Sequence, residues 1–168
     1  MKRTLALVTA LAVVLAIGVM AQGKTDFSGA WKRDATRSDA PQAGRGGPGG
    51  GGGAPAGDVT VTIAQTAADI TIERKMGENA QKSVYKLDGS ESVNPSPRGG
   101  DVKSKAKWEG ANLVIESTQT MSMGGNEVTI TSKEIWTLGT DGAITVGTTR
   151  TTPRGEMTSK TVYTKIAG

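Results

Sequence analysis

Alternation of β-branched and polar residues, interrupted by short turn sequences, runs from residue 58 to the end of the chain. The stretch DVTVTIAQ shows it most clearly, because Val59, Val61 and Ile63 alternate with threonines. A period of two places successive side chains on opposite faces of a β-strand, whereas an amphipathic helix has a period of 3.6 residues. No helical period is present here, so the sequence predicts an all-β protein.

Nine strands are predicted, and most of them are joined by hairpins. The connections contain the turn dipeptides Asp88-Gly89, Glu109-Gly110, Gly124-Gly125 and Asp141-Gly142. The predicted strands cover residues 26–32, 58–65, 69–75, 82–87, 102–108, 112–121, 127–138, 143–151 and 157–166. Consecutive strands with short connections favour an antiparallel meander.

The hairpin turn after Trp108 predicts a definite register. The expected pairs are Trp108 with Leu113, Ala106 with Ile115, and Lys105 with Glu116. One face of the hairpin is then apolar and the other carries opposite charges. Lys103, Lys105 and Lys107 are therefore expected to form a solvated outer face, with a basic binding stripe as the alternative.

The two-residue period breaks down in the segment EVTITSKEIWTL. Val128 and Ile130 share a face with Trp136, but Ser132 and Glu134 lie between them on the same face. Either a β-bulge shifts the register within this strand, or the interior is partly polar, as in a barrel around a wet cavity. Of these two, we expect the bulge.

The N-terminus is predicted to be a secretory signal peptide covering residues 1–21. A basic start at Lys2 and Arg3 precedes an uncharged apolar run, and Val19-Met20-Ala21 supplies the small residues of a cleavage site. Cleavage would leave Gln22 as the first residue. A transmembrane anchor is the alternative, because the run approaches the length that crosses a bilayer. We expect an exported protein, periplasmic or secreted, with no stable membrane insertion after cleavage.

The remainder is expected to be one domain, with its first strand within residues 22–33 and the other strands within 58–168. Residues 34–57 include RGGPGGGGGAPAG and offer little to bury, so they are predicted to form a flexible Gly/Pro-rich loop. The triplet Arg45-Gly46-Gly47 is of the type found in RNA-binding segments, but an RNA contact is not expected of an exported protein. Loss of the basic N-terminus also leaves the chain near neutral, so no nucleic acid partner is expected.

The absence of His and Cys from the sequence excludes several chemistries. Ser-His-Asp and Cys-His centres cannot form, and neither can zinc sites built from imidazole and thiolate. Most carboxylates lie in or beside turns, where they have structural roles. Glu134 is the exception, because it is predicted to face inward beside Trp136. One carboxylate is not an active site, so we expect no enzyme activity, no metal and no cofactor.

Aromatic residues stand at the ends of several predicted strands. In a meander alternate strands run the same way, so Trp31, Trp108, Trp136 and Tyr163 are expected near one end, with Tyr85 at the other. The cluster would either plug the end of a small barrel or form a platform for a ligand, and the plug is the simpler interpretation.

Two short segments resemble a known group of barrels. FSGAWK, which begins at Phe27, resembles the F-x-G-x-W-K opening of fatty-acid-binding proteins and the G-x-W of lipocalins. KTVY, which begins at Lys160, resembles the R-x-Y ending of the fatty-acid-binding group. Overall the chain is similar to uncharacterised, secreted, lipocalin-like (calycin) proteins of bacteria.

The resemblance implies a closed antiparallel meander β-barrel of about 8–10 strands. It also implies that Trp31 packs near a basic residue of the final strand, which is Lys160 or, as the alternative, Lys165. Two departures from the family pattern stand out. Thr161 occupies the position of the family's carboxylate-binding arginine, and the Gly/Pro-rich stretch replaces the helical lid.

The leading functional hypothesis is non-catalytic binding of a small apolar or amphipathic ligand inside the barrel or at its mouth. The candidate ligand-binding residues are Trp31, Trp108, Glu134, Trp136 and Tyr163. The alternative is a structural or protein-interaction module of the cell envelope with a solid core. The chamber requires that the segment beginning at Phe27 pairs with the strand that ends at Ile166.

Overall fold

A computed structural model describes residues 24–40, 58–96, 100–123 and 125–166, which form ten strands in one sheet. The strands are β1 (Gly29–Asp34), β2 (Val59–Gln65), β3 (Asp69–Met76), β4 (Asn79–Lys86), β5 (Glu91–Pro95), β6 (Asp101–Glu109), β7 (Asn112–Met123), β8 (Asn126–Leu138), β9 (Ile144–Thr152) and β10 (Gly155–Lys165). Their order across the sheet is β4-β3-β2-β1-β10-β9-β8-β7-β6-β5, with antiparallel ladders. The predicted all-β meander is confirmed, and β5 is a strand that the sequence did not predict. Across these four ranges, no helix has the length and apolar character needed to traverse a bilayer.

Pairing between the first and last strands curls the sheet into a nearly closed barrel. Trp31 lies opposite Lys165, and the amide of Ile166 donates a hydrogen bond of 2.8 Å to the carbonyl of Ala30. The predicted closure is therefore confirmed. The basic partner of Trp31 is Lys165, whose Nζ lies 5.4 Å from the ring centre, and the prediction of Lys160 is wrong. The register explains this difference, because Lys165 lies directly opposite Trp31 in the β1–β10 ladder, whereas Lys160 lies opposite Gly147 of β9.

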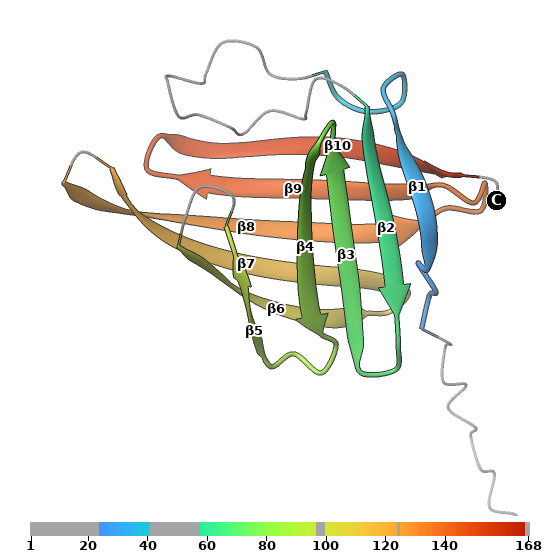
Figure 1. The fold of residues 1–168 in the computed structure, drawn as a ribbon, viewed down its shortest axis with the longest axis horizontal. Coiled ribbons are helices and arrows are strands. Elements are labelled where there is room, and N and C mark those ends of the chain that lie inside the picture. The colour runs from blue at the N-terminus through green and yellow to red at the C-terminus, as the bar shows by residue number, and fades with distance from the viewer. Residues whose placement is uncertain (1–23, 41–57, 97–99, 124, 167–168) are drawn as a thin grey trace, which may run out of the picture.

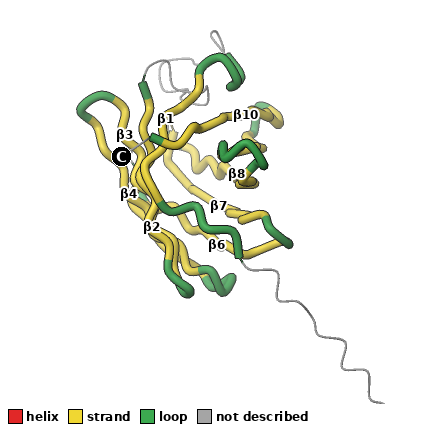
Figure 2. Tube along the Cα trace, turned by 90° about the vertical axis from the view of Figure 1, so that its right-hand side faces the viewer, coloured by secondary structure: helices red, strands yellow, loops and turns green. Residues whose placement is uncertain are grey.

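The barrel encloses its core between two crossing groups of strands. Figure 1 shows β2–β4 running steeply across β6–β10, and Figure 2 shows these two groups on opposite sides of the interior. Val59, Val61 and Ile63 on β2 each expose 3% or less of their surface, as their alternation predicts. Burial of such a side chain contributes about 1.5–3 kcal/mol to the free energy of unfolding.

The register of the β6–β7 hairpin agrees with the prediction. Trp108 lies opposite Leu113, and Lys105 lies opposite Glu116. Ala106 is fully buried, whereas its neighbours Lys105 and Lys107 are exposed. The three lysines of β6 therefore form an outer face, in the arrangement that the hairpin turn implies.

Strand β8 has no bulge, so the prediction of one is wrong. Its pairing with β7 proceeds residue by residue from Asn126 to Trp136, without an unpaired position. Ser132 and Glu134 consequently occupy inner-facing positions together with Trp136. The interior is partly polar, and this polarity is what interrupts the apolar pattern of the strand.

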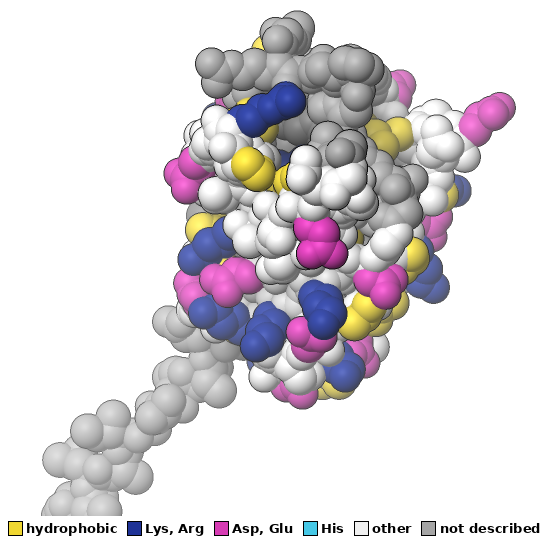
Figure 3. All heavy atoms as spheres, turned by 90° about the vertical axis from the view of Figure 1, so that its left-hand side faces the viewer, with side chains coloured by type: hydrophobic (Ala, Val, Ile, Leu, Met, Phe, Trp, Pro, Cys, Tyr) yellow, Lys and Arg dark blue, Asp and Glu magenta, His cyan; other side chains and the backbone are white. Residues whose placement is uncertain are grey.

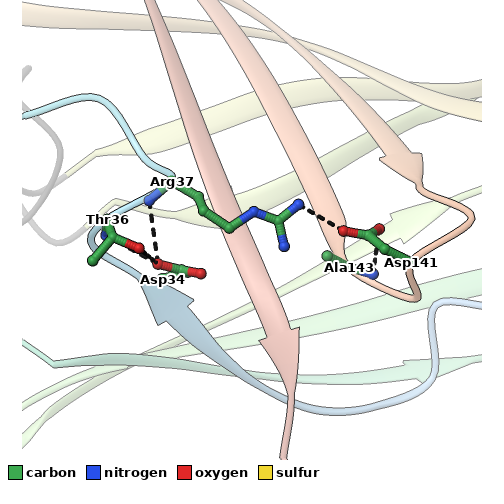
Figure 4. A network of polar contacts seen from close by, with 5 residues as sticks. All are labelled: Asp34, Thr36, Arg37, Asp141 and Ala143. Atoms are coloured by element: carbon green, nitrogen blue, oxygen red, sulfur yellow. Dashed lines mark hydrogen bonds and ion pairs between the residues drawn. The ribbon is translucent and has the colours of Figure 1, made fainter.

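The turn after β1 is held against the barrel, although a flexible loop is predicted from residue 34. The amide of Asp39 donates to the carbonyl of Lys160 at 2.8 Å. Figure 4 shows Arg37 reaching Asp141 across β10, with 2.7 Å between Nη2 and Oδ2. Asp34 accepts hydrogen bonds from Thr36 in the same turn. The signal-peptide prediction for 1–21 and the remainder of the loop, 41–57, lie outside the described residues.

Candidate functional site

Over three successive rows that begin at the aromatic end, the inner surface of the barrel changes from apolar to polar. Cross-strand registers sort the inner-facing side chains of β6–β10 into rows. The apolar row consists of Trp108, Leu113, Trp136 and Val146 and ends at Thr161. The middle row contains Ala106, Ile115, Glu134, Thr148 and Ser159. The next row, here called the serine row, contains Ser104, Ser117 and Ser132 and ends at Arg150 and Met157.

An aromatic cluster fills the apolar end. The ring of Phe27 stacks on Trp108 with 5.9 Å between centroids and meets Trp136 edge-on at 6.4 Å. Trp136 stacks on Tyr163 at 6.3 Å, and the indole nitrogen of Trp31 donates to the carbonyl of Phe27 at 2.9 Å. Trp31 and Trp136 expose no more than 2% of their surface. Side chains buried this deeply plug the end of the barrel.

A charged group lies beside this cluster, inside the barrel. Oε2 of Glu134 accepts one hydrogen bond from Nη2 of Arg74 and another from the indole nitrogen of Trp136, both at 2.9 Å. About a quarter of each charged side chain remains exposed, 25% for Arg74 and 24% for Glu134. The guanidinium of Arg74 also lies 5.4 Å from the centre of the Trp136 ring. Each polar group of this pair is therefore satisfied within the interior.

Two tyrosines extend the charged group. Burial lowers the pKa of Arg74, but Glu134 and the phenols of Tyr85 and Tyr163 more than offset this effect and raise it above its ordinary value. Burial raises the pKa of Tyr163 above its ordinary value of 10.0, and Arg74 offsets part of that shift. Tyr85 thus lies with the other aromatics, and its predicted place at the opposite end is wrong. Crossing of β4 over the opposite wall brings it there.

Arg33 is a second interior cation. It lies on β1 opposite Tyr163, and 8% of its surface is exposed. Its Nη2 donates to the carbonyl of Asp39 at 3.1 Å, whereas its Nε is buried and has no hydrogen-bond partner among the residues that the structure describes. The indole nitrogen of Trp108 is likewise buried without a partner in the described part of the chain. Both groups are donors.

The charge of the inner wall is positive. Arg33, Arg74 and Arg150 occupy inner-facing positions on β1, β3 and β9, and in the described strands Glu134 is the acidic residue at such a position. Ser104 and Ser117, joined by a hydrogen bond of 2.8 Å between their hydroxyls, add polar surface with little bulk. An apolar end, small hydroxyl groups and excess positive charge suit an amphipathic anion.

The outer face has a different character. A groove of about 560 Å³ lies over β5–β9. Threonines, lysines and glutamates of the outer face line it, together with the three serines of the serine row. Nζ of Lys133 lies 3.8 Å from Oε1 of Glu116, and Nζ of Lys103 lies 3.8 Å from Oε1 of Glu91. On the side of the molecule that Figure 3 draws, acidic and basic side chains are likewise interspersed. Exposed pairs of this kind contribute little to stability, and this face is a solvated one on which lysines and glutamates lie side by side.

The five residues predicted for the site all occupy inner-facing positions, and the structure brings them together: the four aromatic residues belong to the cluster around Phe27, and Glu134 contacts it through Trp136. Glu134, Trp136 and Tyr163 meet around Arg74, whereas Trp31 is a buried part of the plug. The sequence analysis did not identify Arg74 or Arg33. Arg74 follows Ile70 and Ile72 at spacings of two, which was the available signal for an inward side chain. In the described ranges, no cluster of three or more potential metal ligands is present.

This chain, with ten antiparallel strands around a partly polar interior, shares its fold with solved structures of a bile acid-binding protein and a lipid binding protein. Three solved structures illustrate the similarity. The zebrafish ileal bile acid-binding protein in complex with cholic acid has a TM-score of 0.58 and 15% identity, and the match covers 83% of this chain and 98% of that one. A secretory abundant heat soluble protein from Ramazzottius varieornatus has a TM-score of 0.56, 15% identity and coverages of 83% and 95%.

Lipid binding protein 8 from Caenorhabditis elegans, in its apo form, has a TM-score of 0.53 and 12% identity. The match covers 90% of this chain and 100% of that one. Identities this low show a shared fold and leave the ligand of this chain to be inferred from its own residues. No family model matches the sequence, and no curated protein matches it.

Proposed function

We propose that this protein binds a small amphipathic anion, without catalysis, in the interior of its barrel. The apolar part of the ligand would lie toward the aromatic end, and its acidic group would face the interior arginines. The bile acid bound by the zebrafish neighbour is an amphipathic acid, which supports this class of ligand. The gradient from the apolar row to the serine row supports it from the residues of this chain.

Arg33 is the observation on which the proposal chiefly rests. A buried charge needs a partner, because its desolvation is otherwise uncompensated. Arg74 has that partner in Glu134, whereas Arg33 forms no ion pair with any described carboxylate and keeps a buried Nε donor without an acceptor. A bound carboxylate or sulfonate would supply both the charge and the acceptor.

The absence of His and Cys supports a binding role rather than an enzymatic one, and the three neighbours are described as binding or heat-soluble proteins rather than enzymes. Export through the N-terminal apolar segment also belongs to the proposal. Expression of the full chain in a bacterium tests it, since mass spectrometry of the exported product would find Gln22 at its N-terminus. An intact Met1 in a cytoplasmic product would contradict export.

Titration with two fluorescent probes tests the binding proposal. Anilinonaphthalene sulfonate is an amphipathic anion, and Nile red is apolar and uncharged. We expect both to bind the wild type, and we expect Arg33→Gln to weaken binding of the sulfonate by about tenfold, equivalent to about 1.4 kcal/mol, while Nile red binding stays within about twofold. Lys105→Gln removes the same charge from the outer face and should change neither affinity.

Two results would contradict this function. If neither probe binds the wild type, the interior is filled and the envelope-module alternative is favoured. If Lys105→Gln weakens sulfonate binding as much as Arg33→Gln does, the attraction is a general surface effect rather than an interior site.

A further inference from the structure

The barrel has one seam that no backbone ladder closes. β4 and β5 are the two edge strands of the sheet, and they lie side by side. Every other pair of adjacent strands in the described sheet is joined by antiparallel backbone hydrogen bonds. In the described strands, the wall of the barrel is therefore a continuous backbone ladder except between β4 and β5.

Two side chains of β5 bridge this seam in place of a ladder. Oδ1 of Asn94 accepts a hydrogen bond of 2.8 Å from the amide of Val84, and its Nδ2 donates one of 3.0 Å to the carbonyl of the same residue. Oγ of Ser92 accepts a bond of 2.9 Å from the amide of Lys86. The amide group of Asn94 thus acts as a peptide group would in a neighbouring strand.

Both bridging side chains face the interior. Asn94 is 6% exposed and Ser92 is 7% exposed, and Ser92 lies opposite Ser104 of the serine row. On the outer side of the same seam, Val84 and Val93 are 42% and 55% exposed. An exposed apolar edge therefore lies outside the seam and the polar part of the barrel interior lies behind it, and three hydrogen bonds among the described residues bridge the two strands.

We propose that this side-chain bridge is a gate, and that its opening admits the ligand between β4 and β5. The inference rests on the proposed binding function. Opening breaks the three bridging bonds and leaves all the ladders intact, whereas opening any other pair of adjacent strands would break a ladder. Val84 and Val93 would offer the apolar part of a ligand its first contact. The aromatic cluster closes one end of the barrel, which makes a lateral route useful.

Hydrogen exchange of the ligand-free protein tests whether the seam opens. The amides of Val84 and Lys86 should exchange at least about tenfold faster than amides within the β7–β8 ladder, because they are protected by side chains alone. Asn94→Ala should accelerate exchange at Val84 further. Protection of Val84 equal to that of the β7–β8 ladder would overturn the gate.

Stopped-flow mixing with anilinonaphthalene sulfonate tests whether the seam is the route. Asn94→Ala should raise the association and dissociation rates together by about threefold or more, with Kd within about twofold, because a gate changes rates rather than affinity. Asn112→Ala is the control, since it also removes an asparagine side chain that takes part in hydrogen bonding, in this case one bond from Thr137, but lies away from the seam. Ser92→Ala is a milder second variant that should raise both rates in the same direction.

The outcomes separate the two proposals. Unchanged rates in Asn94→Ala and Ser92→Ala, with a wild type that binds the probe, would overturn the gate alone. A wild type that binds neither the sulfonate nor Nile red would remove the binding function and the gate with it. Equal acceleration in Asn112→Ala would show a general loosening and would also overturn the gate.

Discussion

The guanidinium of Arg74, on β3, lies 5.4 Å from the centre of the Trp136 ring, on β8. These strands are not neighbours in the sheet, so the contact spans the interior of the barrel. Glu134 precedes Trp136 by two residues on the same face of β8, and it accepts hydrogen bonds from both Arg74 and Trp136. The three side chains tie the two walls together with a cation–π contact and a charge-assisted hydrogen bond.

Removal of the carboxylate from this group should destabilise the barrel. In Glu134→Ala the charge of Arg74 is left partly buried without a counter-ion, and we expect a loss of about 2–3 kcal/mol in the free energy of unfolding. Glu134→Gln should lose less, because its amide oxygen can still accept from Trp136. Urea unfolding followed by tryptophan fluorescence measures both. A loss below about 0.5 kcal/mol in Glu134→Ala would show that solvent already screens the pair.

A double variant serves as the control for that experiment. Arg74→Met combined with Glu134→Gln removes the unpaired charge, so it should be more stable than Glu134→Ala alone. Additive losses in the double variant would contradict a direct interaction between the two residues.

Replacement of two glycines by alanine should have different effects on the stability of the barrel. Gly29 begins β1 with a φ of +133°, and a Cβ there would lie 3.0 Å from Cε of Lys165. Gly29→Ala should therefore cost about 1–3 kcal/mol. Gly147, on β9, has open space around an added Cβ, so Gly147→Ala should be neutral or slightly stabilising. Thermal unfolding of the two variants checks this, and equal shifts in Tm would contradict it.

The phenol of Tyr163 should ionise at a higher pH than an exposed tyrosine. The chain has two tyrosines, so Tyr85→Phe leaves Tyr163 as the single phenol for an absorbance titration. Burial raises the pKa of Tyr163, so the transition should lie above 10.0. The raised pKa belongs to the folded state. The contribution of Tyr163 to stability is therefore fully present below the pKa of tyrosine in the unfolded chain, and it is lost as the pH rises through the pKa of the folded state. A transition at or below 10.0 would contradict burial of the phenol.

The contact between Arg37 and Asp141 should weaken in acid. The hydrogen bond from Arg37 and that from the amide of Ala143 hold the pKa of Asp141 below its ordinary value of 3.8. A lowered pKa in the folded state gives stability that is present above 3.8 and is lost as pH falls through the folded value. The stability difference between wild type and Asp141→Asn should therefore shrink between about pH 5 and pH 2. Urea unfolding at several pH values checks this, with Glu156→Gln, outside the network, as the control.

Local signals in the sequence predicted the local structure well. The two-residue period of β2 and the turn after Trp108 determine burial and register without reference to distant residues. β5 was missed because it is short and ends in Pro95, which is atypical of a strand with neighbours on both sides. In the structure it has a ladder on one side and the seam on the other.

The polar interior could not be predicted in the same way. A bulge was expected in β8 because Ser132 and Glu134 interrupt its apolar period, and a bulge would explain that interruption without a wet interior. The partner of Glu134 is Arg74, which is 60 positions away in the sequence and meets it only after the barrel has closed. Likewise, Lys165 rather than Lys160 covers Trp31 because of the β1–β10 register, which depends on where the first strand begins.

Intermolecular nuclear Overhauser effects test the interior binding site most directly. With anilinonaphthalene sulfonate bound, we predict contacts from its ring protons to the methyl groups of Ile115 and Ile130, which occupy inner-facing positions on β7 and β8. Thr118 and Thr131, on the outer face of the same strands, should show none. Contacts to the two threonines without contacts to the two isoleucines would place the ligand in the outer groove and contradict a chamber inside the barrel.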